Sequence, residues 1–277
     1  MRLHHEVLAG TGTARQSLLV LHGILGSGGN LRTLARQFLE ARPGWQAVLV
    51  DLRAHGESLE DDGQPDTLET ATRDVAALCA ELPVPARAIV GHSFGGKVAL
   101  GLPAMHAGLR HVVALDSTPG TRVDARGSEA TLAVVELLES LRGPWATRDD
   151  FVREVHARGQ TRFLGQWLAM NLEPREGGLH FRLKLPRVRA LLDSYLRTDL
   201  WPMLEEAARA PEGAPQFHLV IGTRSLVFDH EERVHATHLE SESGGRITVD
   251  LLDTGHWVHV DDPKGTLQVL LSRVPAG

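Results

Sequence analysis

The chain has 277 residues, 42% hydrophobic and 23% charged, a balance typical of a globular protein with a sizeable core. Its net charge of −6 argues against nucleic acid or an anionic membrane surface as main partner, and its single cysteine excludes an intrachain disulfide or a thiolate metal cluster. The N-terminal residues lack the apolar run of a secretory signal, and no stretch approaches the ~18 apolar residues of a membrane span. We therefore expect a cytoplasmic protein without membrane insertion, of undetermined oligomeric state.

Short apolar runs alternate with segments of helical period in the first part of the chain. Four runs are typical of strands buried on both faces: 17–21, 47–50, 86–90 and 111–115. Helices are expected around and between them, over residues 30–41, 67–82 and 93–106. This alternation predicts a doubly wound, mostly parallel sheet.

The alternation stops after Asp116. Helical patterns without a convincing strand pair follow, at residues 127–141, 149–172 and 186–196. Strand patterns return at 217–221 and 247–252, and Pro263 suits the first turn of a last helix. We expect an α/β core made of residues 1–119 and 213–277, and a helical cap over residues 120–212 that covers the sheet.

The sequence Gly91-His92-Ser93-Phe94-Gly95 directly follows an apolar run and opens an expected helix. This strand–turn–helix setting is the one that a nucleophile elbow requires. Side chains at either glycine would clash within the sharp turn, and the helix N-terminus directs amide N–H groups at the reaction centre. We expect Ser93 to be the nucleophile; the alternative is a tight turn that binds nothing.

The sequence His22-Gly23-Ile24-Leu25-Gly26 ends the first of these strands. An ester-cleaving serine needs two donors for the oxyanion of its transition state. The expected donors are the backbone amides of Ile24 and Phe94. The alternative is that this segment only turns the chain, and His22 itself is expected to be structural.

The remaining triad members should follow Ser93 in the order acid, then histidine. His256, in Gly255-His256-Trp257 after the last strand pattern, is the expected base. Asp116, at the end of strand 111–115, is favoured as the acid over Asp229. Where the acid would stand after the next strand, the chain has Ser225.

The segment 51–58 gathers Asp, Arg, His and Ser within eight residues, but it is interpreted as a hydrogen-bonded loop. His259 is likewise expected to be structural. No metal-ligand spacing, Walker loop or dinucleotide fingerprint is present, so neither a metal nor a cofactor is expected.

Together these motifs resemble those of the α/β-hydrolase superfamily. Lys97, in Gly91-His-Ser-Phe-Gly-Gly-Lys97, and the run His256-Trp-Val-His259 make the chain most similar to the small bacterial YbfF-type esterases and their mitochondrial relatives. The resemblance implies the α/β-hydrolase fold with a cap after the sixth strand. It also implies hydrolysis of short to medium acyl esters or thioesters through an acyl-enzyme, without a cofactor. It supports Asp116 as the acid, because members of that group also lack Asp at the Ser225 position.

The expected partner is a small acyl substrate. Ser93, where dehalogenases and epoxide hydrolases have Asp, argues against both of those activities. Carbon–carbon bond hydrolases or lyases with the same triad stay open as alternatives, as does a non-catalytic ligand receptor. Phe163, Trp167 and Trp257 are the candidate pocket residues, although aromatic residues of a cap more often form its own core.

Overall fold

The computed structural model describes residues 1–122, 129–211 and 213–276, and a single seven-stranded sheet forms its centre. The sheet order is β1-β3-β2-β4-β5-β8-β9; β1 pairs antiparallel with β3, and every other pair in this sheet is parallel. The strands are β1 His5–Ala9, β2 Gln16–Leu21, β3 Trp45–Val50, β4 Ala86–His92, β5 His111–Leu115, β8 Gln216–Gly222 and β9 Ile247–Leu252. The predicted mostly parallel, doubly wound sheet is confirmed, and β1 is an antiparallel edge strand that was not among the predicted strands.

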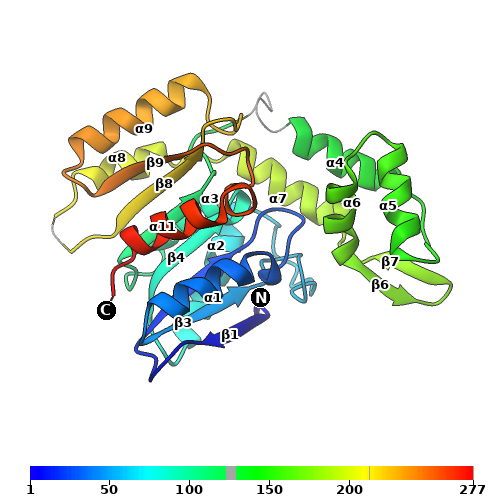
Figure 1. Cartoon of the computed structure of the whole chain (residues 1–277), viewed down its shortest axis with the longest axis horizontal. Helices are drawn as coiled ribbons and strands as arrows, with labels where there is room; N and C mark the ends of the chain where they lie inside the picture. The colour runs from blue at the N-terminus through cyan, green and yellow to red at the C-terminus, as the bar shows by residue number, and fades with distance from the viewer. Residues whose placement is uncertain (123–128, 212, 277) are drawn as a thin grey trace.

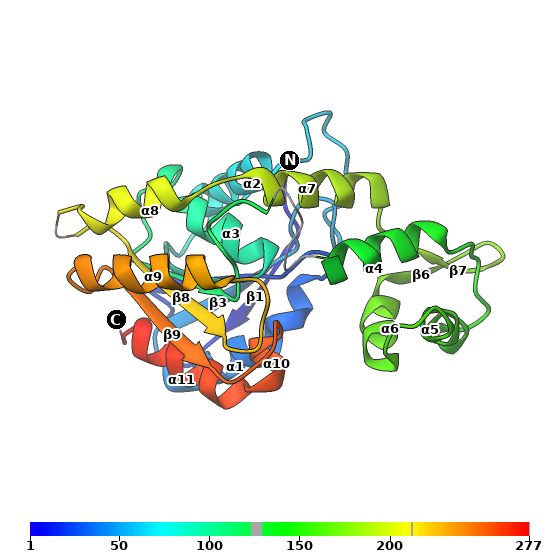
Figure 2. The ribbon, with the colours of Figure 1, turned by 90° about the horizontal axis from the view of Figure 1, so that it is seen from above.

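Helices cover both faces of the sheet (Figures 1 and 2). One face packs against α1 Arg32–Ala41 and α11 Pro263–Arg273. The other packs against α2 Leu68–Glu81, α3 Phe94–Gly101, α8 Trp201–Ala208 and α9 His230–Glu242. Alternate residues of each central strand therefore enter different cores: in β2, Leu18 faces α1 and α11, whereas Leu19 faces α2 and α3. This burial on both faces explains the continuous apolar runs of these strands.

An insertion, comprising the elements from α4 to α7, separates β5 from α8. Its elements are α4 Glu129–Ser140, α5 Arg148–Ala157, α6 Arg162–Leu168, the 3₁₀ turn η3 Ala169–Asn171, β6 Leu172–Arg175, β7 Gly178–Phe181 and α7 Leu185–Arg197. Figure 1 shows α4, α5, α6 and the β6–β7 hairpin grouped at one end of the molecule, with α7 leading back to the core. The insertion follows β5, the fifth strand of the chain rather than the sixth.

Two further expectations about this region were wrong. The β6–β7 hairpin is a strand pair where none was expected, because Pro174 and the charged residues around it hide any alternation of apolar side chains. The expected helix 149–172 is two helices, because α5 ends before Gly159, whose φ is +89°, and Thr161 caps α6. In addition, α8 packs beside α9 and so belongs with the core layer. The start of the expected helix 127–141 and residue 212, the expected end of the cap, lie outside the described residues.

The two connections of the insertion to the core run together beside the helix that follows Ser93. The Leu200 N–H donates to the Pro119 carbonyl at 2.9 Å. Lys97, fully buried on α3, donates from Nζ to the carbonyls of Gly120 at 2.7 Å and Tyr195 at 2.8 Å. Burial lowers the pKa of Lys97 to about 7. The Lys97 side chain of the core thus binds both the segment that leads into the insertion and α7, the last helix of the insertion.

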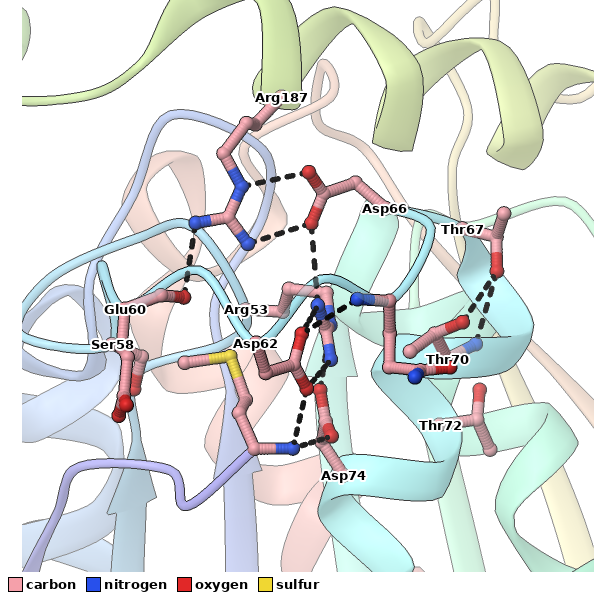
Figure 3. Close-up of polar contacts among 12 residues, drawn as sticks. Arg53, Ser58, Glu60, Asp62, Asp66, Thr67, Thr70, Thr72, Asp74 and Arg187 are labelled. Atoms are coloured by element: carbon pink, nitrogen blue, oxygen red, sulfur yellow. Dashed lines mark hydrogen bonds and ion pairs between the residues drawn. The ribbon is translucent and has the colours of Figure 1, made fainter.

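A buried charge network supports the loop after β3 and reaches α7 (Figure 3). Arg53 is fully buried; its Nε donates to Asp74 at 2.7 Å, and its two terminal nitrogens donate to Asp62 at 2.9 Å each. Arg187 of α7 donates to both oxygens of Asp66, at 2.7 and 2.8 Å. Since Arg53 Nη1 also lies 3.4 Å from Asp66, the network joins this loop, α2 and the insertion.

We expect Arg53→Met to lower the free energy of unfolding by about 3 kcal/mol, because it leaves partly buried carboxylates without their main counter-ion. Urea titration followed by circular dichroism measures this. The control is Arg73→Met on α2, whose pair with Glu69 is exposed and should be worth less than about 1 kcal/mol. Equal, small losses for the two variants would contradict the prediction.

Candidate active site

Ser93 stands on a sharp turn between β4 and α3, with φ of +52° and ψ of −119°. Its N–H donates to the Leu115 carbonyl of β5 at 3.0 Å, which fixes the turn against the neighbouring strand. A Cβ atom at Gly91 would lie 2.1 Å from the Gly95 carbonyl oxygen, and one at Gly95 would lie 2.4 Å from the His22 carbonyl oxygen. Both glycines are therefore required by the close approach of the backbone, as the motif predicts.

The structure brings His256 and Asp116 together. His256 Nδ1 lies 2.7 Å from Asp116 Oδ2, the contact expected from the order of the residues in the chain. Asp116 is fully buried, and its carboxylate also accepts hydrogen bonds from the Gly222 N–H and the Ser225 hydroxyl. Because the Nδ1–H donates to this carboxylate, Nε2 is left as the acceptor nitrogen of His256.

Ser225 and Asp229 make contacts other than one with His256. Ser225 occupies the position where an aspartate was expected, and it supports the carboxylate of Asp116. Asp229, the alternative acid, instead caps α9 by accepting from the Glu232 N–H at 2.9 Å, and it lies 3.6 Å from Arg122. The sequence did not predict this contact of Ser225, since no motif links it to its partner 109 positions away.

The two expected oxyanion donors lie on two segments that meet at Ser93. Phe94 begins α3, and Ile24 lies on the loop after β2. A Cβ atom at Gly23 would lie 3.3 Å from Ser93 Cβ, so this loop passes directly beside the serine. Within the described part of the chain, neither amide donates to a loop carbonyl or to a side chain. Ile24 lines the cavity into which Ser93 opens, whereas Phe94 is not among the lining residues.

Two buried histidines hold the loop that carries Ile24. His22 donates from Nδ1 to the Gly23 carbonyl at 2.7 Å and accepts at Nε2 from the Leu52 N–H at 3.0 Å. His55 donates from Nδ1 to the Arg53 carbonyl and accepts at Nε2 from the Leu25 N–H, both at 2.9 Å. These contacts are those expected of a structural role for His22 and segment 51–58. Burial lowers the pKa of both imidazoles, that of His55 to about 3.

His92 is a further residue of the site whose contacts the sequence did not reveal. It is buried, and its Nε2 donates to the backbone carbonyl of His256 at 2.8 Å. Its ring centroid lies 4.7 Å from those of His256 and His259. Burial lowers the pKa of His259 to about 4. His92 thus ties the segment that carries His256 to the turn that carries Ser93.

Ser93 and His256 open into one cavity of about 270 Å³, whose wall comes from both the core and the insertion. Its apolar lining includes Leu31, Ala133, Val134, Leu164, Trp167 and Trp257. Phe163, expected in the pocket, does not line it; its side chain is 56% exposed, and its ring centroid lies 6.0 Å from that of Trp257. Phe163 and Trp167 lie on the same helix, α6, and only one of them turns inward.

Neither a metal-binding group nor a membrane-spanning helix is found in the described ranges. There, no three His, Cys, Asp or Glu side chains are grouped so as to hold a metal ion. Over the same residues, no helix combines the length and the apolar character needed to cross a bilayer.

The neutral state of His55 generates a pH prediction. Its folded-state pKa lies below the unfolded value of ~6.5, so the native state binds fewer protons, and stability is lost as the pH falls from about 6.5 toward 3. In His55→Gln, an amide oxygen can still accept from the Leu25 N–H. The free energy of unfolding of this variant should therefore fall less between pH 6.5 and 5 than that of the wild type, by up to about 1.4 kcal/mol per pH unit. Urea titrations at several pH values measure this. The exposed His238→Gln is the control, and an unaltered slope in His55→Gln would count against the assignment.

Comparison with known proteins agrees with this arrangement. A family model described as "Alpha/beta hydrolase family" matches residues 18–269. The mouse (Mus musculus) protein named sn-1-specific diacylglycerol lipase ABHD11 is 27% identical over 284 residues, covering 98% of this chain and 84% of the mouse protein. The zebrafish (Danio rerio) protein of the same name is 24% identical over 283 residues, covering 98% and 82%.

Solved structures show the same fold. A marine microorganism esterase superposes with a TM-score of 0.80 at 20% identity, covering 99% of each chain. The E-2-(acetamidomethylene)succinate hydrolase superposes with a TM-score of 0.74 at 22% identity, covering 98% of this chain and 94% of that one. Because the family model spans nearly all of the sheet and its helices, the chain belongs to the alpha/beta hydrolase family.

Proposed function

We propose that the protein is a serine hydrolase that cleaves carboxylic esters or thioesters of short to medium apolar acids. One observation carries the proposal. Ser93, on its strained turn, and His256, held by the buried carboxylate of Asp116, open into the same apolar cavity. Membership of a hydrolase family supports it, and so do the names of the mouse and zebrafish relatives, which describe lipases.

The proposed reaction proceeds through an acyl-enzyme. Ser93 Oγ attacks the acyl carbonyl carbon while His256 Nε2 takes the hydroxyl proton, and Asp116 stabilises the imidazolium that forms. The Ile24 and Phe94 amides donate to the oxyanion of the tetrahedral intermediate. The imidazolium then protonates the leaving alkoxide or thiolate. A water molecule, deprotonated by His256, attacks the acyl-Ser93 ester, and the imidazolium then returns the proton to Ser93 Oγ as the acid leaves.

We also propose that the insertion acts as a cap that selects the acyl group. The cavity is lined by Ala133 and Val134 of α4 and by Leu164 and Trp167 of α6. At about 270 Å³ it is slightly below the ~300–1,000 Å³ of common ligand pockets, which suits one chain of limited length. Each methylene buried there would contribute up to about 0.8 kcal/mol of binding, until the chain meets the end of the cavity.

Replacing Ser93 by Ala should lower kcat by roughly 10⁴-fold or more, because the covalent route is lost while binding is kept. Nitrophenyl esters and acyl thioesters, assayed side by side, measure the loss and distinguish the two leaving groups. A fluorophosphonate probe should label the wild-type protein and not the variant. A folded Ser93→Ala protein with near-normal hydrolysis would refute the mechanism, and an unlabelled, inactive wild type would favour a receptor.

Replacing Trp167 by Ala should shift the preferred acyl length upward, since the side chain removed is part of the cavity wall. The measurement is kcat/KM across a series of straight-chain esters. Phe163→Ala is the matched control on the same helix, because Phe163 is exposed and does not line the cavity. If the two variants give the same length profile as the wild type, the insertion does not select the acyl chain through Trp167.

A further inference from the structure

A side chain of the insertion makes a buried contact with the loop that carries the proposed oxyanion donor. Asn171, the last residue of η3, is 5% exposed, and its Nδ2 donates to the Leu25 carbonyl at 2.8 Å. We propose that Asn171 is a positioning residue that aligns the Ile24 N–H for the oxyanion. The inference rests on the proposed function and adds a role for the insertion in the chemical step.

The alignment passes through two planar peptide groups. The Leu25 carbonyl, held by Asn171, belongs to the same peptide group as the Gly26 N–H. That N–H donates to the Gly23 carbonyl at 3.0 Å. The Gly23 carbonyl in turn shares its peptide plane with the Ile24 N–H, which points the opposite way in a trans peptide. The Gly23 carbonyl also accepts from His22 Nδ1 at 2.7 Å, so His22 and, through the Leu25–Gly26 peptide group, Asn171 together fix the direction of the Ile24 N–H.

The loop needs this support because Leu25 has an unfavourable backbone conformation. Its φ is +63°, in the left-handed region that residues with a side chain seldom adopt. His55 holds the Leu25 N–H and Asn171 holds the Leu25 carbonyl, so both polar groups of this residue are fixed. Without the donor from Asn171, the Leu25–Gly26 peptide group is held only by the hydrogen bond from the Gly26 N–H to the Gly23 carbonyl.

Asn171 is itself held firmly by its surroundings. Its carbonyl accepts from the Arg182 N–H at 2.9 Å. The guanidinium of Arg148, at the start of α5, donates to the carbonyls of Ala169 and Leu172, the latter at 3.1 Å. These contacts tie η3 to α5 and to the β6–β7 hairpin. The position of the Asn171 amide thus depends on the position of the insertion. The loop that carries Ile24 depends on the insertion in turn, through the contact of Asn171 with Leu25.

The test uses two variants of the full chain, Asn171→Leu, which has a similar shape without a donor, and Asn171→Asp, which places an acceptor there. We expect kcat for nitrophenyl esters to fall about tenfold or more, with KM changed less than about twofold, because the oxyanion is bound in the transition state and not in the ground state. Affinity for an alkyl trifluoromethyl ketone, which forms a tetrahedral adduct, should fall by the same factor. Thermal unfolding identifies any variant that does not fold.

The matched control is Gln166→Leu, an amide-to-leucine change at an exposed position of α6, which should leave kcat and inhibitor affinity unchanged. Folded Asn171 variants with wild-type kcat and inhibitor affinity, or with a loss confined to KM, would overturn the inference while ester hydrolysis by the wild type stands. A wild type that neither hydrolyses esters nor reacts with a fluorophosphonate would overturn the proposed function and this inference with it.

Discussion

The whole site depends on sharp backbone turns at the carboxyl ends of four neighbouring parallel strands. In the part of the chain that the structure describes, the non-glycine residues with positive φ follow β2, β3, β4 and β5 in turn: Leu25, Ala54, Ser93 and Asp116. Such conformations cost about 1–3 kcal/mol each and persist only where the surroundings fix them. Here the sheet does so, since Ser93 donates to β5 and Asp116 donates to β8 through their backbone N–H groups. The turns after β4 and β5 carry two of the proposed catalytic residues, Ser93 and Asp116.

The loops around these turns are held in place by hydrogen bonds to buried histidines and carboxylates. His22, His55 and His92 each join two segments that are distant in the chain, and each is buried away from solvent. The same principle extends outward, because Lys97 and Arg187 tie the insertion to α3 and to the loop after β3. Core and insertion therefore form one connected structure around the cavity, and the geometry of the proposed oxyanion loop depends on both.

The sequence predicted the central strands and the motifs at their ends, because parallel strands buried on both faces leave long apolar runs and the turns need glycine. Strands at edges were missed: β1 and the β6–β7 hairpin have exposed or polar faces and lack such runs. The contact of Asp116 with His256 could be predicted from chain order. The contacts of Ser225 and Asn171 could not, since no motif in the sequence links either residue to its partner, 109 and 146 positions away. Nor could the sequence show which aromatic residue of α6 turns inward.

The closeness of the insertion's two connections has a consequence for how the chain folds. Pairing β5 with β8 requires the whole intervening segment to close as a loop, and the entropy lost grows with the length of flexible chain between the paired residues. If the insertion collapses first on its own apolar residues, and Pro119 and Leu200 are thereby brought together, less chain has to be ordered when β5 pairs with β8. Early folding of the insertion would then reduce the conformational entropy lost when β5 pairs with β8. The segment proposed to select the substrate would also set the rate at which the sheet is completed.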